Sequence, residues 1–252
     1  MKLVLRESRY LKDSIAIVSE MVTEANIKVS SDRMELVAMD PANVAMVIFK
    51  LFSSCFVEYS VKEDMEIAIN LTNLRQILRR VNPTDTITLE AGEEGKSNKL
   101  KIIIKGNSTR TFEIPIIELE EKDQKIPELD FPVEIKTTSS LLSESIEDVD
   151  IVAEAVNFIA EKNKFVILAE GDLNKAKIEI DANEDTKITL SGDEDKIKAK
   201  YSIEYLKKMI SGGKLADQVS IRFNKDYPLK IEFVSVDKLL LSFILAPRVE
   251  ND

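Results

Sequence analysis

An internal duplication constrains the fold of this chain more than any other feature of its sequence. Five apolar positions recur 131 residues later, in the pairs Leu11/Leu142, Ile15/Ile146, Val18/Val149, Ile27/Phe158 and Leu36/Ile167. Seven more positions, five apolar and two charged, recur 132 residues later, in the pairs Leu74/Leu206, Arg75/Lys207, Ile77/Met209, Leu78/Ile210, Asp85/Asp217, Ile87/Val219 and Leu89/Ile221. Because chance does not supply a collinear series along both halves, the sequence predicts two copies of one structural unit.

Strand patterns dominate each copy. Residues 35–49 alternate in polarity on both sides of Asp40-Pro41-Ala42-Asn43, which predicts two strands joined by a tight connection. Gly106-Asn107 is expected to turn a second strand pair that ends near Ile117. The fold class that follows is α+β: two duplicated domains, each an antiparallel sheet of eight or nine strands with two helices on one face.

Two helices are expected in the first copy. One follows Ser8, with an apolar stripe that extends as far as Ala25. The other is expected to be capped by Thr72 and to end at Pro83. The repeat predicts their counterparts in the second copy.

The stretch between the copies differs from both of them. It is acidic and aperiodic from Glu118 to Phe131, is interrupted by Pro127 and is closed by Pro132. This composition is typical of a linker. The predicted domains are therefore residues 1–117 and 133–252, with a connecting loop at 118–132.

Composition excludes several classes of site. The 252 residues carry a formal net charge of −10 and include no histidine and one cysteine. Without histidine, Ser-His-Asp, Cys-His and histidine-rich metal sites are excluded, and Cys55 has no activating neighbour. We predict no enzyme activity, no catalytic residue, no cofactor and no metal. Without a signal sequence, a disulfide pair or an apolar run of ~18 residues, a soluble cytoplasmic protein with no membrane partner is expected.

Basic residues gather on helix faces that correspond in the two copies. They are Lys12 on the first helix, Arg75, Arg79 and Arg80 on the second, Lys207 and Lys208 on the matching helix of the repeat, and Lys214 after it. On an acidic protein, a repeated basic face indicates contact with an anion, most simply nucleic-acid phosphates without base reading. Solvated helix surfaces are the alternative.

Two segments are candidates for open sheet edges, namely Thr109–Pro115 and Ala176–Ile180. A strand with unpaired backbone groups has to be covered, and pairing with another subunit is one way to cover it. Either segment could be such an edge.

Three segments, taken in order along the chain, resemble the proliferating cell nuclear antigen (PCNA) family of DNA sliding clamps in its archaeal form. They are Met39–Ala45, Ile126–Phe131 and Leu245–Glu250. The resemblance implies a trimeric ring that encircles duplex DNA, works as a non-enzymatic processivity factor, and tethers DNA polymerase, clamp loader, ligase and nuclease peptides. It implies a place at the nucleoid, or in the nucleus of a eukaryote. A subunit of a heterotrimeric or checkpoint-type clamp, which assembles only with different partner chains, is the alternative.

The resemblance also assigns residues to two further surfaces. The expected subunit interface comprises Thr109, Arg110, Thr111, Phe112, Glu144, Asp148, Lys177, Ile178 and Ile180. The expected apolar site for partner peptides comprises Met39, Val44, Met46, Ile126, Phe131, Pro228, Ile244, Leu245, Ala246 and Pro247, and a role in the core between the domains is the alternative.

The third helix, expected near residues 140–152, departs from the basic pattern because it carries four acids and no base. The resemblance implies that Glu144 and Asp148 face Arg79, Arg80 or Arg110 of a neighbouring subunit. A repulsive segment inside the ring is the competing account.

Overall fold

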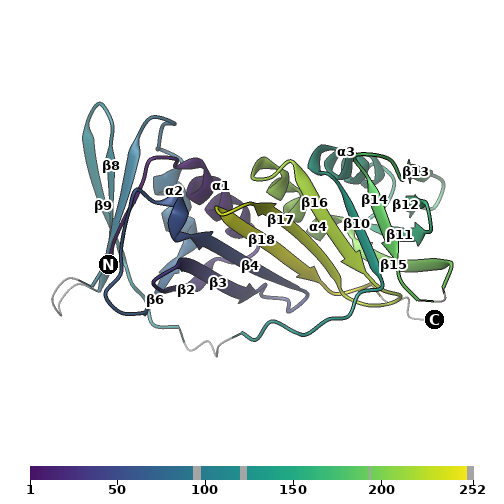
Figure 1. Cartoon of the computed structure of the whole chain (residues 1–252), viewed down its shortest axis with the longest axis horizontal. Coiled ribbons are helices and arrows are strands. Elements are labelled where there is room, and N and C mark those ends of the chain that lie inside the picture. The colour runs from purple at the N-terminus through teal and green to yellow at the C-terminus, as the bar shows by residue number, and fades with distance from the viewer. Residues whose placement is uncertain (93–97, 120–123, 193, 249–252) are drawn as a thin grey trace. The chain divides into compact units, whose positions relative to one another are not determined.

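Short strands and helices build the chain (Figure 1). Burial alternates along several of the strands, and each helix buries one face. This computed structural model describes residues 1–92, 98–119, 124–192 and 194–248. The chain divides into two compact units. Unit 1 is Met1–Pro41, Val47–Ile126 and Ser235–Leu241, and unit 2 is Ala42–Met46, Pro127–Val234 and Ser242–Asp252.

The first copy of the repeat contains two helices among short strands. Its elements are β1 (Lys2–Leu5), α1 (Arg9–Val18), β2 (Glu24–Val29), β3 (Arg33–Met39), β4 (Ala45–Phe52), η1 (Ser53–Cys55), β5 (Glu58–Ser60), β6 (Met65–Asn70), α2 (Leu71–Leu78), β7 (Thr86–Glu90), β8 (Lys99–Lys105) and β9 (Thr109–Pro115). Within it, neighbouring strands follow the orders β5-β1-β7-β8-β9 and β4-β3-β2-β6.

The second copy repeats this series. Its elements are β10 (Val133–Thr138), α3 (Ser139–Asp150), β11 (Ala155–Glu161), β12 (Lys164–Glu170), β13 (Lys175–Asp181), β14 (Lys187–Leu190), β15 (Lys196–Ser202), α4 (Ile203–Ile210), η2 (Ser211–Lys214), β16 (Gln218–Phe223), β17 (Leu229–Ser235) and β18 (Leu239–Leu245). Its strand orders are β14-β10-β16-β17-β18 and β13-β12-β11-β15.

The two copies therefore share one topology, because every strand number in the second copy is nine higher than its counterpart in the first. The expectation of one sheet of eight or nine strands per copy is wrong: the described strands of each copy form a group of five and a group of four. The reason is that α1 separates β1 from β2, so β1 pairs with β5 and β7 instead. The same holds for β10, which pairs with β14 and β16.

The core of the second copy is built around aromatic side chains. The rings of Phe165, Tyr201 and Phe223 surround Phe158 at centroid distances of 5.3, 5.6 and 6.1 Å, and all four side chains are fully buried. Edge-to-face packing of this kind adds to the stabilisation from burial alone. In the first copy the equivalents of Phe158 and Phe165 are Ile27 and Met34, so its core is more aliphatic.

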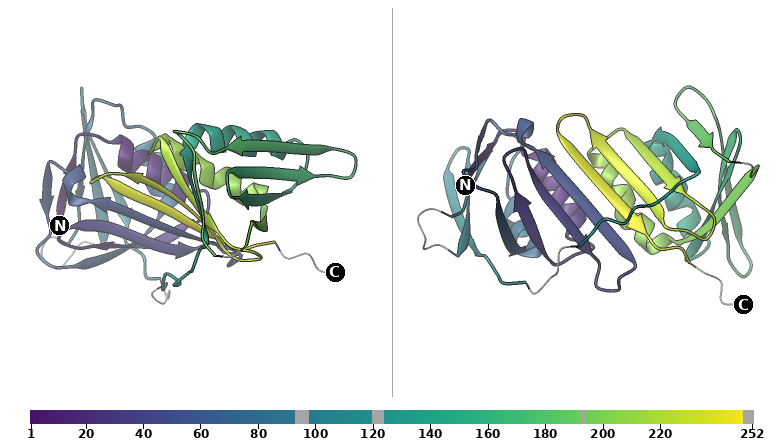
Figure 2. Two further views of the ribbon diagram at one scale, coloured as in Figure 1. Left: turned by 45° about the vertical axis from the view of Figure 1, so that its right-hand side comes forward. Right: turned by 60° about the horizontal axis from the view of Figure 1, so that its bottom comes forward.

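The two helices of each copy pack against one another, α1 against α2 and α3 against α4 (Figure 2). Helix α1 buries Leu11, Ile15 and Val18, and α3 buries their repeat partners. The polar faces of each helix pair therefore share one surface.

Helix α1 is shorter than the periodicity predicts. It ends at Val18, where the backbone N–H groups of Glu20 and Met21 bond the carbonyls of Ile17 and Val18 at i−3 spacing. Met21 is still buried, and Ala25 belongs to β2. An apolar residue in a tight turn can imitate the helical period, which is why the stripe was too long.

The expected caps and one short strand also differ from the prediction. The side chain of Asn70, and not that of Thr72, caps α2 by accepting a hydrogen bond from the Asn73 N–H at 3.0 Å. Ser8 is the residue before α1, as expected, and its side chain makes no capping hydrogen bond. Strand β5 was not predicted, because three residues are too few to display a period.

Candidate functional site

The polar face of α1 and α2 carries basic side chains with a partner and basic side chains without one. Lys12 donates to the Val81 carbonyl at 2.9 Å, and Arg75 forms an ion pair with Glu20 at 3.4 Å. Arg79 and Arg80 follow the end of α2; both are exposed, and their side chains have no partner among the described residues. These two arginines can contact an external anion without first breaking an ion pair.

The corresponding face in unit 2 shows the same division. Lys207 is paired with Asp150 at 2.5 Å, and Lys208 is paired with Glu204 at 3.2 Å while lying 5.0 Å from the ring centre of Tyr205. Lys214, at the end of η2, is exposed and has no side-chain partner in the described part of the chain. Exposed ion pairs contribute ~0–1 kcal/mol, so the paired lysines can exchange a carboxylate for a phosphate at little cost.

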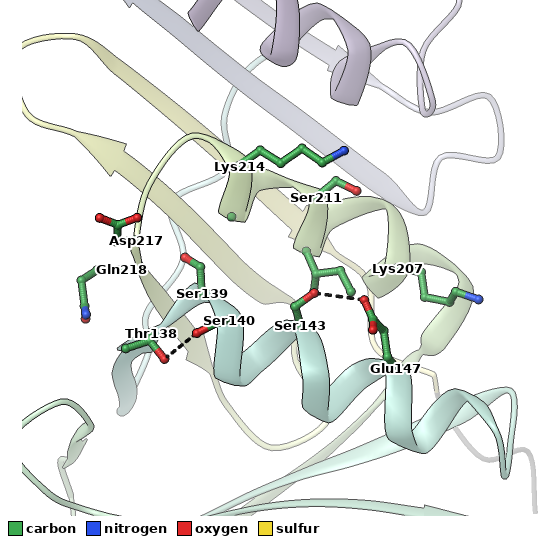
Figure 3. A pocket seen from close by; sticks show the side chains of 12 residues that line it. Thr138, Ser139, Ser140, Ser143, Glu147, Lys207, Ser211, Lys214, Asp217 and Gln218 are labelled. Atoms are coloured by element: carbon green, nitrogen blue, oxygen red, sulfur yellow. Dashed lines mark hydrogen bonds between the residues drawn. The ribbon is translucent and has the colours of Figure 1, made fainter. Parts of the chain in front are cut away.

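A hollow of about 700 Å³ lies between α3 and the segment formed by α4 and η2 (Figure 3). Lys207 and Lys214 stand on the α4 and η2 side, and the hydroxyls of Ser139, Ser140 and Ser143 stand on the α3 side. The structure thus brings two of the predicted cations to one polar surface, and it adds serines that sequence reasoning did not select.

Arg9 is a basic residue that the sequence reasoning missed. It lines a second hollow in unit 1 together with Lys12, and its guanidinium lies 5.0 Å from the ring centre of Tyr10. Residues three apart on a helix share a face, so the spacing of Arg9 and Lys12 was a signal that could have identified it.

The acidic α3 helix is only partly neutralised within its own chain. Asp150 is paired with Lys207 and Glu147 accepts from the Ser143 hydroxyl, whereas Glu144 and Asp148 are exposed without a partner in the described residues. These two are four residues apart, so they share one helix face.

Two seven-residue strands, β9 and β13, have one strand neighbour each in the described chain, β8 and β12. Their burial patterns are identical along all seven positions. Next to β9, the Gly106 N–H donates to the Ser108 carbonyl and the Ile116 N–H donates to the Asn98 carbonyl. These bonds show which residue pairs of the β8–β9 ladder are hydrogen-bonded and which are not. The backbone groups of Thr109, Thr111 and Glu113 therefore face away from β8.

The same reasoning orients β13. The bonds from Gly171 N–H to Asn174 and from Ala182 N–H to Asn163 place Ile178 opposite Ile167 in a hydrogen-bonded pair. The backbone of Ile178 therefore faces β12, and the groups on the open edge belong to Lys175, Lys177 and Glu179. Of the predicted interface residues in β13, Lys177 presents its backbone outward, whereas Ile178 and Ile180 contribute half-buried and buried side chains.

Arg110, another predicted interface residue, is held inside its own chain. One of its Nη groups donates to the Arg80 carbonyl at 2.9 Å and the other to Asp85 Oδ2 at 2.5 Å. Asp85 is buried, and a Cβ at Gly106 would overlap its carboxylate, so glycine makes room for this pair. Arg110 is thus less available to a neighbouring acid than Arg79 or Arg80.

The predicted partner-peptide residues fall into exposed and buried groups. Met46 and Ile244 are 7% exposed and Leu245 is 0% exposed; they belong to β4 and β18, which are buried along most of their length. These three side chains are therefore buried in the chain alone, and their place in a partner-peptide site stays a prediction. The accessible or half-buried members are Met39, Val44, Ile126, Phe131, Pro228, Ala246 and Pro247.

Two contacts hold the unit 2 members of this group. The Ala246 N–H donates to the Val44 carbonyl at 2.9 Å. The ring of Phe131 meets Tyr227 edge-to-face, with 6.0 Å between the ring centres. Segments distant in the sequence are thereby joined within unit 2.

Cys55 is buried beside the Lys238 carbonyl, and burial raises the pKa of its thiol from 9.0 to about 11. At pH 8 the thiolate fraction of Cys55 is thus about 100-fold lower in the folded chain than in the unfolded chain. The folding stability gained by keeping the thiol neutral is lost as the pH rises from 9 through 11. We expect a thiol reagent such as DTNB to label the folded chain about 100-fold more slowly than the urea-unfolded chain at pH 8. Equal rates would contradict the burial of Cys55.

Among the described residues, no helix is long and apolar enough to cross a membrane, and no cluster of three or more candidate metal ligands occurs.

Comparison with known proteins decides the family. The family model of the PCNA N-terminal domain matches residues 1–125, and that of the C-terminal domain matches residues 125–248. The chain belongs to the PCNA family. The two PCNA domain models meet inside the predicted connecting loop, whose bounds at 118 and 132 remain a prediction.

Relatives of this PCNA-family chain match it along its length. The DNA polymerase sliding clamps of Thermococcus onnurineus and Pyrococcus furiosus are 35% and 34% identical over 250 residues, with 99% of each chain covered. That of Nanoarchaeum equitans is 33% identical, covering 98% of this chain and 99% of its own. The crystal structure of PCNA from Thermococcus kodakaraensis matches with a TM-score of 0.89 at 25% identity, covering 98% of this chain and 99% of that one. The predicted α+β clamp fold and archaeal PCNA-type resemblance are confirmed.

Proposed function

We propose that this chain is a DNA sliding clamp subunit, part of a ring that encircles duplex DNA and tethers replication enzymes without catalysing a reaction itself. The carrying observation is the basic face on the helix pair of both copies, in a PCNA-family chain whose net charge is −10. An acidic protein does not attract DNA by its overall field, so a local face must make the contact. Phosphate contacts carry no sequence information, which suits a ring that slides.

Primer extension on a long primed single-stranded circle tests this function. With the cognate polymerase and clamp loader present, adding this chain should increase the length of DNA that is synthesised in one polymerase binding event. The chain alone should incorporate no nucleotide. A chain that leaves product length unchanged, at a concentration where it assembles, would overturn the proposal.

The ring closes, in this proposal, by antiparallel addition of the open edge of β9 in one subunit to that of β13 in the next. Both edges are seven residues long and present alternate backbone groups outward, so one ladder covers both. A register with Thr111 opposite Glu179 places Glu113 opposite Lys177, which are opposite charges. That Glu144 and Asp148 face Arg79, Arg80 or Arg110 of the neighbour stays a prediction, and a repulsive segment inside the ring stays the competing account.

A heterotrimer with related chains would use the same edges. The mass of the purified chain, measured by light scattering over a dilution series, separates the two assemblies: a homotrimer gives about 85 kDa, three times the 28.4 kDa chain. A stable 28.4 kDa species at micromolar concentration would favour the heterotrimeric alternative.

The accessible members of the partner-peptide group are proposed to bind short helical segments with aromatic anchors, from polymerases, clamp loaders, ligases and nucleases. Ala246→Asp should weaken binding of such a peptide at least tenfold, because it places a charge among apolar side chains at an exposed position. Fluorescence anisotropy with a labelled peptide measures the change.

Val236→Asp is the matched control, since Val236 is 78% exposed in the turn at the other end of β18. Leu245→Ser is unsuitable as a binding test, because truncating this buried leucine should cost about 3 kcal/mol of folding stability. Equal affinities of the Ala246→Asp and Val236→Asp variants would remove Ala246 from the site.

A further inference from the structure

A second basic surface lies in unit 2, away from the helix faces. We call it the β15 groove: a hollow of about 530 Å³ lined by Lys196, Lys198 and Lys200 of β15 together with Asn157, Lys225 and Arg248. Two acids, Glu194 and Asp226, also line it, so cations outnumber anions there.

The groove runs along a sheet edge. In the described chain, β15 is the last strand of its group and pairs with β11 alone. The Arg248 N–H donates to the Lys200 carbonyl at 2.7 Å, so the backbone of Lys200 faces away from β11. Because outward and inward groups alternate along a strand, the backbones of Lys198 and Lys196 face the same open side.

The duplication supplies an internal comparison for this edge. In the first copy the Ile117 N–H donates to the Ala68 carbonyl at 2.9 Å, and these residues correspond to Arg248 and Lys200. In both copies, a following segment of the chain thus makes a backbone hydrogen bond at the same place on the equivalent edge strand.

The charges at the two edges are opposite. Glu66 occupies the position of Lys198, and its carboxylate accepts from the Asn26 side-chain amide at 2.7 Å. Asn157, the repeat partner of Asn26, has a lysine at that place instead. The backbone arrangement is repeated while the charge is reversed, so the basic character of β15 is specific to the second copy.

Asn157 lines the groove from β11, the strand paired with β15. Its side chain is 6% exposed, and Oδ1 has no hydrogen-bond partner among the described residues. Nδ2 lies 3.5 Å from the Leu168 carbonyl, so reversing the amide would bring two acceptors together. The Oδ1 of Asn26, its repeat partner, is likewise unpartnered, so this atom does not distinguish the two copies. The ligand class follows from the open edge: the outward carbonyls of Lys196 and Lys198 need donors, which a peptide N–H supplies and a phosphodiester lacks.

The cations require a negative charge on the same ligand. Lys196 is already paired with Glu161 at 3.0 Å, and Arg248 lies 3.9 Å from Glu154. Lys198 and Lys225 have no side-chain partner within the described residues. Carboxylates on alternate residues of an added strand would lie beside these lysines.

We propose that the β15 groove binds an extended acidic peptide segment of a partner protein by strand addition to the edge at Lys196 and Lys198. This surface is separate from the helix faces and from the apolar partner group. It depends on unit 2 alone, so a failure of DNA loading would leave it standing.

The test uses a fluorescent, end-blocked octapeptide of alternating glutamate and valine, the full-length chain, and fluorescence anisotropy at two salt concentrations. We expect saturable binding that weakens with salt, and at least a tenfold loss of affinity in Lys198→Glu, which introduces the first copy's residue. Lys187→Glu makes the same charge change on β14, outside the groove, and should alter affinity less than twofold. An equal loss in both variants, or equal binding of the lysine-valine octapeptide, would overturn the proposal.

Amide hydrogen exchange supplies a readout that charge alone does not move. Strand addition should slow exchange at Lys196 and Lys198 when the glutamate-valine peptide binds. Binding without this protection, together with equal competition by a short single-stranded DNA, would identify a phosphate surface and overturn the peptide proposal. Binding that appears only when the chain is cut after Arg248 would identify its own last residues as the occupant, and would overturn it as well.

Discussion

Lys177→Pro is expected to convert the proposed trimer into monomers while leaving the fold of each chain intact. The Lys177 N–H faces the open edge of β13, so proline removes a donor from the proposed ladder between subunits and none from the β12–β13 ladder. We expect the mass at micromolar concentration to fall from about 85 kDa to the mass of one chain, 28.4 kDa. Folding stability should change by less than about 1 kcal/mol.

Two variants make this result specific. Lys177→Ala removes the same side chain but keeps the N–H, and it should remain trimeric. Ile178→Pro, one residue further on, removes a bond to Ile167 inside the chain and should lower folding stability by about 3 kcal/mol or more. A Lys177→Pro variant that sediments as a trimer would show that β13 is not the joining edge.

Reversing the unpaired helix cations should have the largest effect on DNA binding. The triple variant Arg79→Glu, Arg80→Glu, Lys214→Glu replaces exposed cations, which have no side-chain partners among the described residues, with anions that repel phosphate. We expect duplex affinity at ~0.1 M salt to fall at least tenfold and its salt dependence to weaken. Anisotropy with a labelled linear duplex measures both quantities.

The matched control for this variant reverses three exposed lysines that lie outside the helices, Lys62, Lys162 and Lys187. It has the same change in net charge, so it isolates position from overall field. Reversal of Lys207 and Lys208 should have a smaller effect, because each already has a carboxylate partner. Equal losses in the triple variant and its control would remove the helix faces from the DNA contact.

Much of the fold could be predicted from the sequence because the repeated positions are mostly apolar residues that the fold buries. Leu11, Ile15 and Val18 and their partners at 142, 146 and 149 are all buried, so the repeat and the helix pairs followed from periodicity. The division of each copy into two strand groups did not follow, since periodicity identifies strands but not their neighbours. The short β5 gave no pattern at all.

The candidate sites, too, could be predicted only in part from the sequence. The basic positions of α2 and α4 could be selected from spacing, but their state depends on partners distant in sequence, such as Asp150 for Lys207 and Glu20 for Arg75. The outward edge of β13 depends on which residues of β12 share a hydrogen-bonded pair, and that register is absent from a one-dimensional pattern. Leu245 stands beside a turn in the sequence, which suggested an accessible side chain. It belongs to β18, however, and is fully buried there.

Retention on circular DNA tests most directly whether this chain encircles duplex DNA. The labelled chain is loaded by its cognate loader onto a nicked plasmid, and the complex is passed over a gel-filtration column at a salt concentration that screens phosphate contacts. The proposed topology predicts co-elution with the circle and complete release after a single restriction cut. Equal retention on cut and uncut plasmid, or none on the circle, would contradict it.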